Sequence, residues 1–299
     1  MAELGERRGM GVGGGPLVVI VLSHRNPGQV ARLVDRIRTG VDTVAVIHHD
    51  PSGEPLNLRP SSNVALIPDA RPCQWGRLSL VEAQWRSLRW VAANIPEFSW
   101  VLLVSGQDYP IRPVTAIEKE LAASPYDAYL RHFAVTPDPA ADTDPWQAVT
   151  RRRYLRKRRL PGTHRSVPLP FERRHPYRDG VGLYVGDMWF NLSAETVHGM
   201  LADPLADRLL RYLRYAPIPD ETFICSLALN ARPARSVADD SRRFIRWGAD
   251  ASHPDLITAA HLDELRASDA FFARKIDVSA YPKVPDLLDQ LAADRRPGP

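Results

Sequence analysis

The sequence has few cysteines and no long apolar run, and both absences limit what the chain can be. Its 299 residues include two cysteines, Cys73 and Cys225, which could form at most one disulfide bond. A chain of this length can bury a core large enough to fold without one, so we expect a reducing, cytoplasmic setting. The longest apolar run, from Pro16 to Ser23, is far shorter than the ~20 residues that a membrane-spanning helix needs. We therefore predict no membrane span.

The sequence also lacks a signal peptide and a dinucleotide-binding fingerprint. Residues 1–15 are rich in glycine and lead directly into a short apolar run, so we expect a disordered tail there and not a cleavable leader. The cluster Gly11–Gly15 precedes the first expected strand, whereas a Gly-x-Gly-x-x-Gly loop must follow one. Binding of NAD or FAD is therefore disfavoured.

The composition and the charge are those of a globular protein with one basic segment. With 44% hydrophobic and 25% charged residues, the chain is neither collagen-like nor wholly disordered. The net charge is +4, but residues 151–178 hold eleven Lys or Arg and one acid, Glu172. Because Tyr154 is the only aromatic residue within Arg151–Arg159, this run does not resemble a platform for single-stranded nucleic acid. We interpret residues 136–180 as a long basic loop, either a solvated loop or a flap that binds an anionic acceptor, and not as a nucleic-acid site.

Alternation of strand and helix patterns predicts an α/β fold with a mostly parallel sheet. In the first half, continuous apolar runs predict strands, and apolar residues at helical spacing predict helices. The expected strands are 17–23, 42–49, 63–68, 100–105 and 128–133, and the expected helices are 30–37, 78–94 and 114–123. Strands buried on both faces indicate helices on both sides of the sheet. Ligands of such sheets bind at the carboxyl ends of the strands, where the loops at His24, Asp50 and Asp108 lie.

The second half is less regular. A strand is expected at 183–192 and another at 243–247, with helices at 194–200, 204–215, 221–231 and 259–266. We predict a single domain over residues 16–285. It would consist of a first half at 16–135, the basic loop at 136–180 and a second half at 181–285, followed by a C-terminal tail at 286–299.

Two short segments could carry chemistry, and each has a plainer interpretation. Asp220-Glu221 follows a Pro-rich turn, so Asp220 could simply cap a helix with Glu221 in its first turn, or Glu221 could act as a general base. Arg274-Lys275 could neutralise a diphosphate or could be a solvated pair. Arg243 carries the same ambiguity.

Metal binding is disfavoured by the residues present. His48 and His49 are adjacent on an expected strand, so their side chains point to opposite faces and cannot easily share one ion. Asp142-Thr143-Asp144 has the Asp-x-Asp form of metal-dependent sugar transferases, but it lies in a Pro- and Asp-rich loop and does not follow a buried strand. We expect no metal and no cofactor.

Six segments stand out together, in this order along the chain: His48-His49-Asp50, Trp75 with the helix from Leu80, Trp100–Arg112 (WVLLVSGQDYPIR), Gly186–Phe190 (GDMWF), Pro219-Asp220-Glu221 and Phe272–Asp277 (FARKID). In content and order they resemble the core-2/I-branching β-1,6-N-acetylglucosaminyltransferase family, which includes the peptide-O-xylosyltransferases. One departure is His49, which stands where the family has valine. The chain also has only two cysteines and no expected membrane span, unlike the anchored Golgi members, so we expect a bacterial, cytoplasmic version.

The resemblance implies a GT-A type fold and an inverting, metal-independent transfer from a UDP-sugar that forms a β-linkage. It also implies that residues 16–135 form the nucleotide-sugar-binding half and residues 181–285 the acceptor and catalytic half. N-acetylglucosamine is the expected sugar, ahead of xylose, and the acceptor is a small molecule or glycan. The implied roles are Glu221 as catalytic base; Arg274, Lys275 and Arg243 on the diphosphate; His24 and Asp50 on the uridine; and Asp108, Trp189 and Trp75 around the sugar and acceptor. The alternative is a non-catalytic protein that binds a nucleotide sugar or an anionic polymer.

Overall fold

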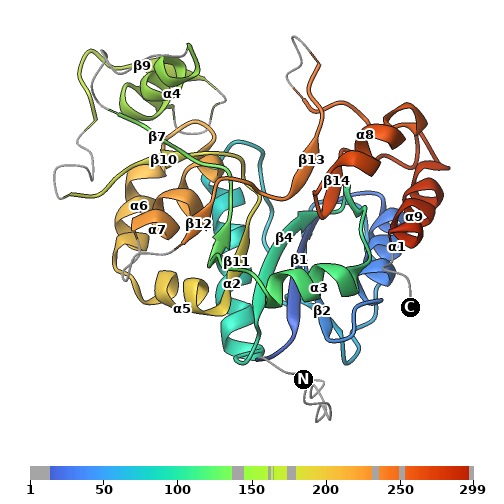
Figure 1. Ribbon diagram of the computed structural model, residues 1–299. Helices are drawn as coiled ribbons and strands as arrows, with labels where there is room; N and C mark the ends of the chain where they lie inside the picture. The colour runs from blue at the N-terminus through green and yellow to red at the C-terminus, as the bar shows by residue number, and fades with distance from the viewer. Residues whose placement is uncertain are drawn as a thin grey trace.

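The computed structural model describes residues 14–136, 145–160, 163, 165–173, 180–230, 236–248 and 253–295 (Figure 1). At its centre is a seven-stranded sheet with the strand order β12-β6-β11-β4-β1-β2-β3. These strands are β1 (Leu17–Ser23), β2 (Thr43–His49), β3 (Val64–Leu66), β4 (Trp100–Ser105), β6 (Ala128–Tyr129), β11 (Asn191–Ser193) and β12 (Val237–Ala238). Neighbouring strands are parallel except for β11, which runs antiparallel to β4 and β6. The predicted mostly parallel α/β fold is confirmed.

The core strands form because their residues are β-branched or apolar on both faces. All seven residues of β1 are buried, and its side chains alternate between two apolar clusters. Val18, Ile20 and Leu22 belong to the cluster on one face, whereas Leu17, Val19 and Val21 belong to the cluster on the other. The expected strands at 17–23 and 100–105 are confirmed to the residue.

Helices cover both faces of this sheet (Figure 1). One face is packed by α2 (Leu78–Asn94), α5 (Ala194–Ala202), α6 (Leu205–Leu213) and α7 (Phe223–Asn230). The other is packed by α1 (Pro27–Ile37), α3 (Val114–Ala122), α8 (Leu262–Ala267) and α9 (Val284–Asp294). Two 3₁₀ turns complete these layers, η3 (Pro219–Glu221) and η4 (Ala259–His261).

Three small sheets flank the central one. The three-stranded sheet has the order β13-β14-β5, formed by β13 (Arg243–Ile245), β14 (Phe272–Arg274) and β5 (Asp108–Pro110). The two-stranded sheets pair β7 (Phe133–Ala134) with β10 (Tyr184–Val185), and β8 (Lys157–Arg159) with β9 (Ser166–Pro168). Since β5 follows β4 almost directly, the three-stranded sheet is held at the carboxyl end of the central strands.

Part of the expected basic loop is instead regular structure. Residues 145–155 form helix α4 (Pro145–Leu155), and β8 and β9 follow it. The sequence pattern does not reveal this helix, because Tyr154 and Leu155 are the two residues of its C-terminal turn that join the core next to α6 and α7. Residues 1–13 of the expected N-terminal tail and the Asp142-Thr143-Asp144 motif lie outside the described residues.

Two expected strands are each divided. The segments 128–133 and 183–192 both leave the central sheet midway, and their separated parts, β7 and β10, pair with each other. The backbones approach so closely there that a Cβ on Gly186 would lie 1.7 Å from the carbonyl oxygen of Arg131. Glycine is therefore required where the chains cross.

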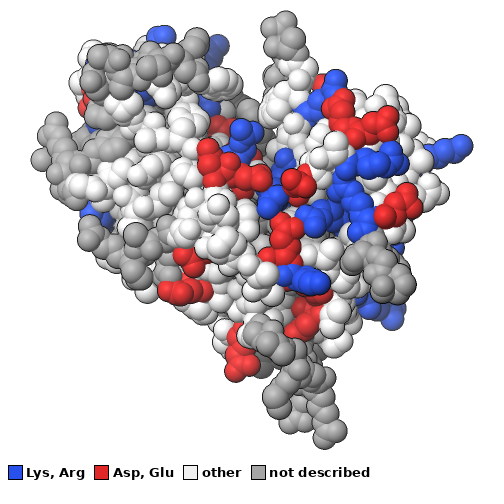
Figure 2. Space-filling model, in the orientation of Figure 1, with Lys and Arg blue, Asp and Glu red and all other residues white. Residues whose placement is uncertain are grey.

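The expected C-terminal tail from residue 286 is wrong over most of its length, because α9 extends to Asp294. Leu288 and Leu291 are buried against the sheet. Arg32 of α1 also pairs with Asp286 and Asp289 of α9, each at 2.6 Å. In the view of Figure 2, basic and acidic side chains are interspersed on the half of the molecule that carries α3, α8 and α9.

The structure also describes both cysteines and the length of each helix. Both thiols, Cys73 and Cys225, are free. Within the described ranges, no helix has both the length and the apolar character needed to cross a bilayer.

Candidate active site

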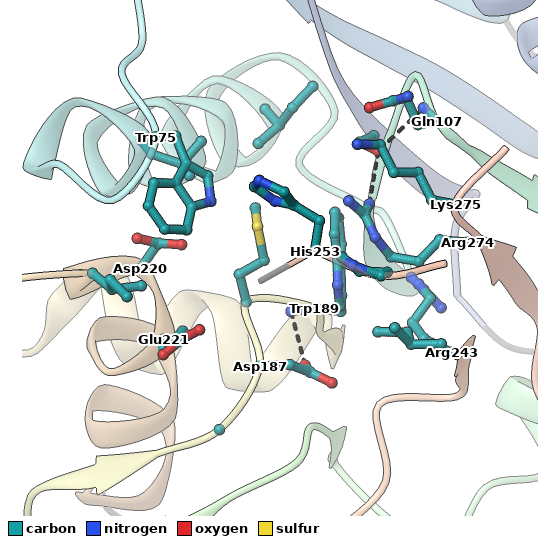
Figure 3. A pocket seen from close by; sticks show the side chains of 18 of the residues that line it. Trp75, Gln107, Asp187, Trp189, Asp220, Glu221, Arg243, His253, Arg274 and Lys275 are labelled. Carbon is teal, nitrogen blue, oxygen red and sulfur yellow. Dashed lines mark hydrogen bonds between the residues drawn. The ribbon is translucent and has the colours of Figure 1, made fainter. Parts of the chain in front are cut away.

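A cavity of about 1030 Å³ lies at the carboxyl ends of β1, β2 and β4 (Figure 3). Its walls bring together residues from distant parts of the chain, among them His24, Asp50, Glu221, Arg274 and Lys275. In Figure 1, α4 and the pair β13–β14 stand on opposite sides of this opening. The cavity therefore occupies the position at which an open α/β sheet binds its ligands.

One end of the cavity is cationic and is organised around Arg274. This residue ends β14 and pairs in register with Asp108 of the antiparallel strand β5. Its Nη1 atom donates to Ser105 Oγ at 3.0 Å and lies 3.3 Å from Asp108 Oδ2, while the guanidinium stacks on Trp189 at 4.5 Å from the ring centroid. Contacts on two sides thus fix the guanidinium at the cavity wall, so Arg274 is not part of a solvated pair.

Asp108 supports this arrangement from below the cavity. Its side chain is fully buried, and Oδ2 accepts from the Ser105 backbone N–H at 2.5 Å and from Ser105 Oγ at 2.6 Å. Without exposed atoms it cannot contact a sugar or acceptor from this position. The structure therefore corrects the predicted role of Asp108: it orients Arg274.

Lys275 and Arg25 extend the cationic end. Both line the cavity, and Arg25 lies 3.6 Å from Asp277. Burial, together with the charges of Arg25 and Arg274, lowers the pKa of Lys275. Among the residues that the structure describes, none forms a hydrogen bond or ion pair with the Lys275 ammonium group. Its charge is therefore directed to the cavity.

Arg243 differs from these cations because its guanidinium points into the protein. Nη2 donates to the Leu103 carbonyl at 2.7 Å, and Nη1 donates to the Arg242 carbonyl at 3.2 Å. The group stacks 4.8 Å from the Phe272 ring centroid, and burial lowers its pKa to about 10. Arg243 lines the cavity, but its guanidinium joins the central sheet to the three-stranded sheet, and the diphosphate contact stays a prediction.

His24 and Asp50 lie together where β1 and β2 end. Both Asp50 oxygens accept hydrogen bonds, Oδ1 from Ser52 and Oδ2 from the Cys73 backbone N–H at 2.7 Å. Burial raises the pKa of Asp50, but these hydrogen bonds have the larger effect and hold the pKa of Asp50 below the usual range. Burial and the charge of Arg25 lower the pKa of His24, which is therefore a neutral, exposed ring at neutral pH.

The opposite end of the cavity is the turn that carries Glu221. Ile218, just before it, has a φ of 49°, a left-handed conformation that is costly for a β-branched residue. The Tyr154 hydroxyl donates to the Ile218 carbonyl at 2.7 Å, and the Ile218 N–H donates to the Gly76 carbonyl at 3.2 Å. Gly186 N–H donates to the Glu221 carbonyl at 2.9 Å. The turn is therefore held from three sides.

Glu221 has the properties of a base near neutral pH. Its pKa is raised to about 7, because burial and the neighbouring charge of Asp220 disfavour the carboxylate. Arg153 of α4 acts in the opposite direction and donates to Glu221 Oε2 at 3.0 Å. About a third of the side chain, 34%, is exposed at the cavity.

Asp220 is not the helix cap that the plainer interpretation expected. It lies inside η3, before α7 begins at Phe223, and is 4% exposed. Burial raises its pKa to about 6, and its Oδ1 atom makes no hydrogen bond. Asp220 therefore acts on Glu221 through its charge.

The two predicted tryptophans differ in exposure. Trp189 is buried beneath Arg274 and lines the wall, whereas Trp75 is 69% exposed. Trp75 contacts His253 edge to face at 6.3 Å between ring centroids. Both tryptophans thus reach the cavity, at different depths.

Among the site residues whose place the sequence did not reveal are Asp187, His253 and Arg153, of which Arg153 was predicted only as part of the basic segment that recognises the acceptor. Asp187 lies within the GDMWF segment, and burial raises its pKa to about 6. Arg153 was visible only as one of many arginines, because its contact with Glu221 spans 68 residues and depends on α4. His253 had no sequence signal at all.

The described residues include no group of three or more His, Cys, Asp and Glu side chains that could hold a metal ion. His48 and His49 point apart, as predicted: His48 is buried, while His49 contacts Ser23 Oγ at 2.9 Å.

Comparison with known proteins gives three findings. The model of the family "Branch: Core-2/I-Branching enzyme" matches residues 41–267. The N-acetyllactosaminide β-1,6-N-acetylglucosaminyl-transferase of Mus musculus is 21% identical over 302 residues, covering 94% of this chain and 73% of that protein. A crystal structure of S. aureus TarS 1–349 aligns with 94% of this chain and 72% of that chain at 12% identity and a TM-score of 0.36.

Proposed function

Because the chain belongs to the core-2/I-branching enzyme family, a family of glycosyltransferases, we propose that it transfers a sugar from a UDP-sugar to an acceptor hydroxyl with inversion. One observation carries the proposal. A carboxylate with a pKa of about 7, Glu221, and a cationic wall formed by Arg274 and Lys275 line the same cavity. This is the arrangement that a single displacement at a sugar carbon requires.

Glu221 would act as the general base. The acceptor oxygen attacks the anomeric carbon, and its proton passes to the Glu221 carboxylate as the new C–O bond forms. The bond from the anomeric carbon to the β-phosphate oxygen breaks on the opposite face, and its electron pair leaves with UDP. One displacement inverts the anomeric centre, so an α-linked donor gives a β-linked product.

Arg274 and Lys275 would stabilise the leaving diphosphate. Negative charge grows on the β-phosphate as its bond to the sugar breaks, and preorganised cations at that position lower the barrier. Arg274 is held by Ser105, Asp108 and Trp189, so it needs little reorganisation during the reaction. We propose that these side chains replace the divalent ion that other sugar transferases use.

The remaining roles are proposed by analogy with the family, for residues that line the same cavity. His24 and Asp50 would contact the uridine, while Trp189 and Trp75 would contact the sugar and acceptor. The mouse relative is named for N-acetylglucosaminyl transfer, which makes N-acetylglucosamine the first donor to test, ahead of xylose.

The test is UDP release from a panel of UDP-sugars with EDTA present, comparing the wild type with Glu221→Gln. Slow transfer to water reports the donor before the acceptor is known. We expect one UDP-sugar to turn over in EDTA, with a loss of about 10²- to 10⁴-fold in the variant. Turnover that requires added metal contradicts the role of the two cations, and turnover that survives Glu221→Gln contradicts the base.

The alternative is a protein that binds a nucleotide sugar or an anionic polymer without chemistry. It predicts UDP-sugar binding by calorimetry with no UDP release from any donor. The raised pKa of Glu221 favours the enzyme, because a binding protein does not need a carboxylate that ionises near pH 7.

A further inference from the structure

Two arginines outside the cavity lie between the start of α2 and the β8–β9 hairpin. Arg77 directly precedes α2, and its Nη2 donates to the carbonyl of Thr163, a residue between β8 and β9, at 3.3 Å. Arg159 ends β8, and a Cβ placed on Gly76 would lie 3.6 Å from its Nη2. The guanidinium groups of two elements thus occupy the same gap.

Their surroundings leave both charges without an anionic partner. Neither forms an ion pair with any carboxylate in the described part of the chain, and both Nε atoms are buried without a hydrogen-bond partner. Burial and the charge of Arg77 lower the pKa of Arg159. Asp220 acts on Arg159 from the neighbouring turn, but its buried Oδ1 makes no hydrogen bond either. Juxtaposed cations with unused donors are unfavourable unless an oxyanion accepts from them.

The gap adjoins the catalytic turn and not the donor cations. Arg77 is two residues from Trp75, which lines the cavity, and the Gly76 carbonyl accepts from Ile218 N–H. Figure 3 shows Trp75 and Asp220 at one end of the cavity, with Lys275 and Arg274 at the other. An oxyanion held by Arg77 and Arg159 would therefore lie on the side from which the acceptor approaches Glu221.

We propose that Arg77 and Arg159 form a subsite for a phosphate group carried by the acceptor. This inference rests on the proposed transferase function, because it takes the far end of the cavity as the donor site. The phosphate accepts hydrogen bonds from both guanidinium groups, and this contact holds the rest of the acceptor so that a hydroxyl reaches Glu221.

The test uses glycerol 3-phosphate, glycerol and inorganic phosphate as probes. Each is titrated calorimetrically into the full chain saturated with UDP, so that the donor cations are already occupied. The proteins are the wild type, the double variant Arg77→Gln/Arg159→Gln and the matched control Arg165→Gln. Arg165 lies next to the same hairpin and is exposed, so the control removes one positive charge from that hairpin without entering the gap.

We expect glycerol 3-phosphate to bind the wild type and Arg165→Gln, glycerol not to bind, and the double variant to lose about tenfold or more in affinity. Thermal melting follows the same pattern: glycerol 3-phosphate raises the Tm of the wild type and the control but not that of the double variant. A purely structural role of the two arginines would lower the Tm without removing its dependence on the phosphate ester.

Three results overturn the proposal. Equal affinity in the wild type and the double variant places the anion elsewhere, and an equal loss in Arg165→Gln shows that only overall charge matters. Binding of inorganic phosphate without glycerol 3-phosphate shows a site for the free ion and not for an acceptor. Failure of the proposed function is seen separately, as wild-type protein that does not bind UDP, and titration without UDP still tests the arginine pair.

Discussion

The two ends of the cavity are built differently. At the end that we propose to bind the donor, His24, Asp50 and Ser105 lie where long, buried, parallel strands stop, so the backbone of the sheet fixes their positions. At the end that we propose to be catalytic, Glu221 lies on a 3₁₀ turn that receives hydrogen bonds from Tyr154 and Gly186 and donates one to the Gly76 carbonyl. The donor end is thus fixed by the core of the fold, and the catalytic end by a few side chains and loops. Substitutions should reveal this difference.

Apart from Glu221→Gln itself, the largest effect is expected from the cations of the donor end. Lys275→Gln should reduce UDP release about 100-fold, because a preorganised charge on the leaving group is lost. Turnover and UDP affinity are measured together in EDTA, with the exposed Lys283→Gln as the control. If Lys275→Gln keeps wild-type turnover, the charge on the leaving diphosphate is stabilised elsewhere.

Arg274→Gln should also lower the Tm, since it leaves the buried Asp108 carboxylate without its cation. The double variant Arg274→Gln/Asp108→Asn should recover the Tm without recovering turnover. Recovery of both would make Arg274 a structural residue only.

A smaller effect is expected at the catalytic end from Tyr154→Phe. Loss of the hydroxyl leaves the Ile218 carbonyl without its donor and loosens the turn, so kcat should fall about tenfold while UDP affinity is unchanged. Kinetics and UDP titration check this, and Tyr126→Phe at an exposed site is the control. A change in UDP affinity would show that the two ends are not independent.

The smallest expected effect is a shift in pH dependence. Transfer needs ionised Glu221, so its rate should rise with pH through about 7. Arg153→Gln removes a charge that favours the carboxylate and should move the midpoint to higher pH, whereas Asp220→Asn removes one that opposes it and should move the midpoint to lower pH. Each shift is about one pH unit. The measurement is kcat as a function of pH for both variants. Midpoints that shift in the same direction in both would contradict this electrostatic account.

The difference between elements fixed by the core and elements fixed by a few contacts also decides which parts of the fold the sequence could predict. The strands 17–23 and 100–105 and the helix 78–94 were found to the residue, because runs of buried residues and helical spacing are local signals. Helix α4 was missed because its only core residues lie in its last turn. Helix α9 was missed because the sequence after residue 285 was taken for a tail.

The sequence predicted which residues line the cavity better than it predicted what each of them does there. Of the predicted residues, all but Asp108 line the cavity. The sequence could not show that Asp108 lies beneath Arg274, or that Arg243 turns inward, because both depend on strand pairing in a sheet formed by β5, β13 and β14. Register between strands distant in sequence leaves no periodic pattern.

The inward-facing Arg243 affects how relatives of this chain could be recombined. Its guanidinium lies between two sheets, bonded to the Leu103 carbonyl of β4 and stacked on Phe272 of β14. In a hybrid that takes the residues before β13 from one homologue and the rest from another, Arg243 and the Leu103 carbonyl come from different parents. We expect the donor cations of such a hybrid to stay aligned only if both parents have an arginine at this position and the same hydrogen-bond acceptors around it. Arg243 is therefore the first position to compare when a crossover point is chosen.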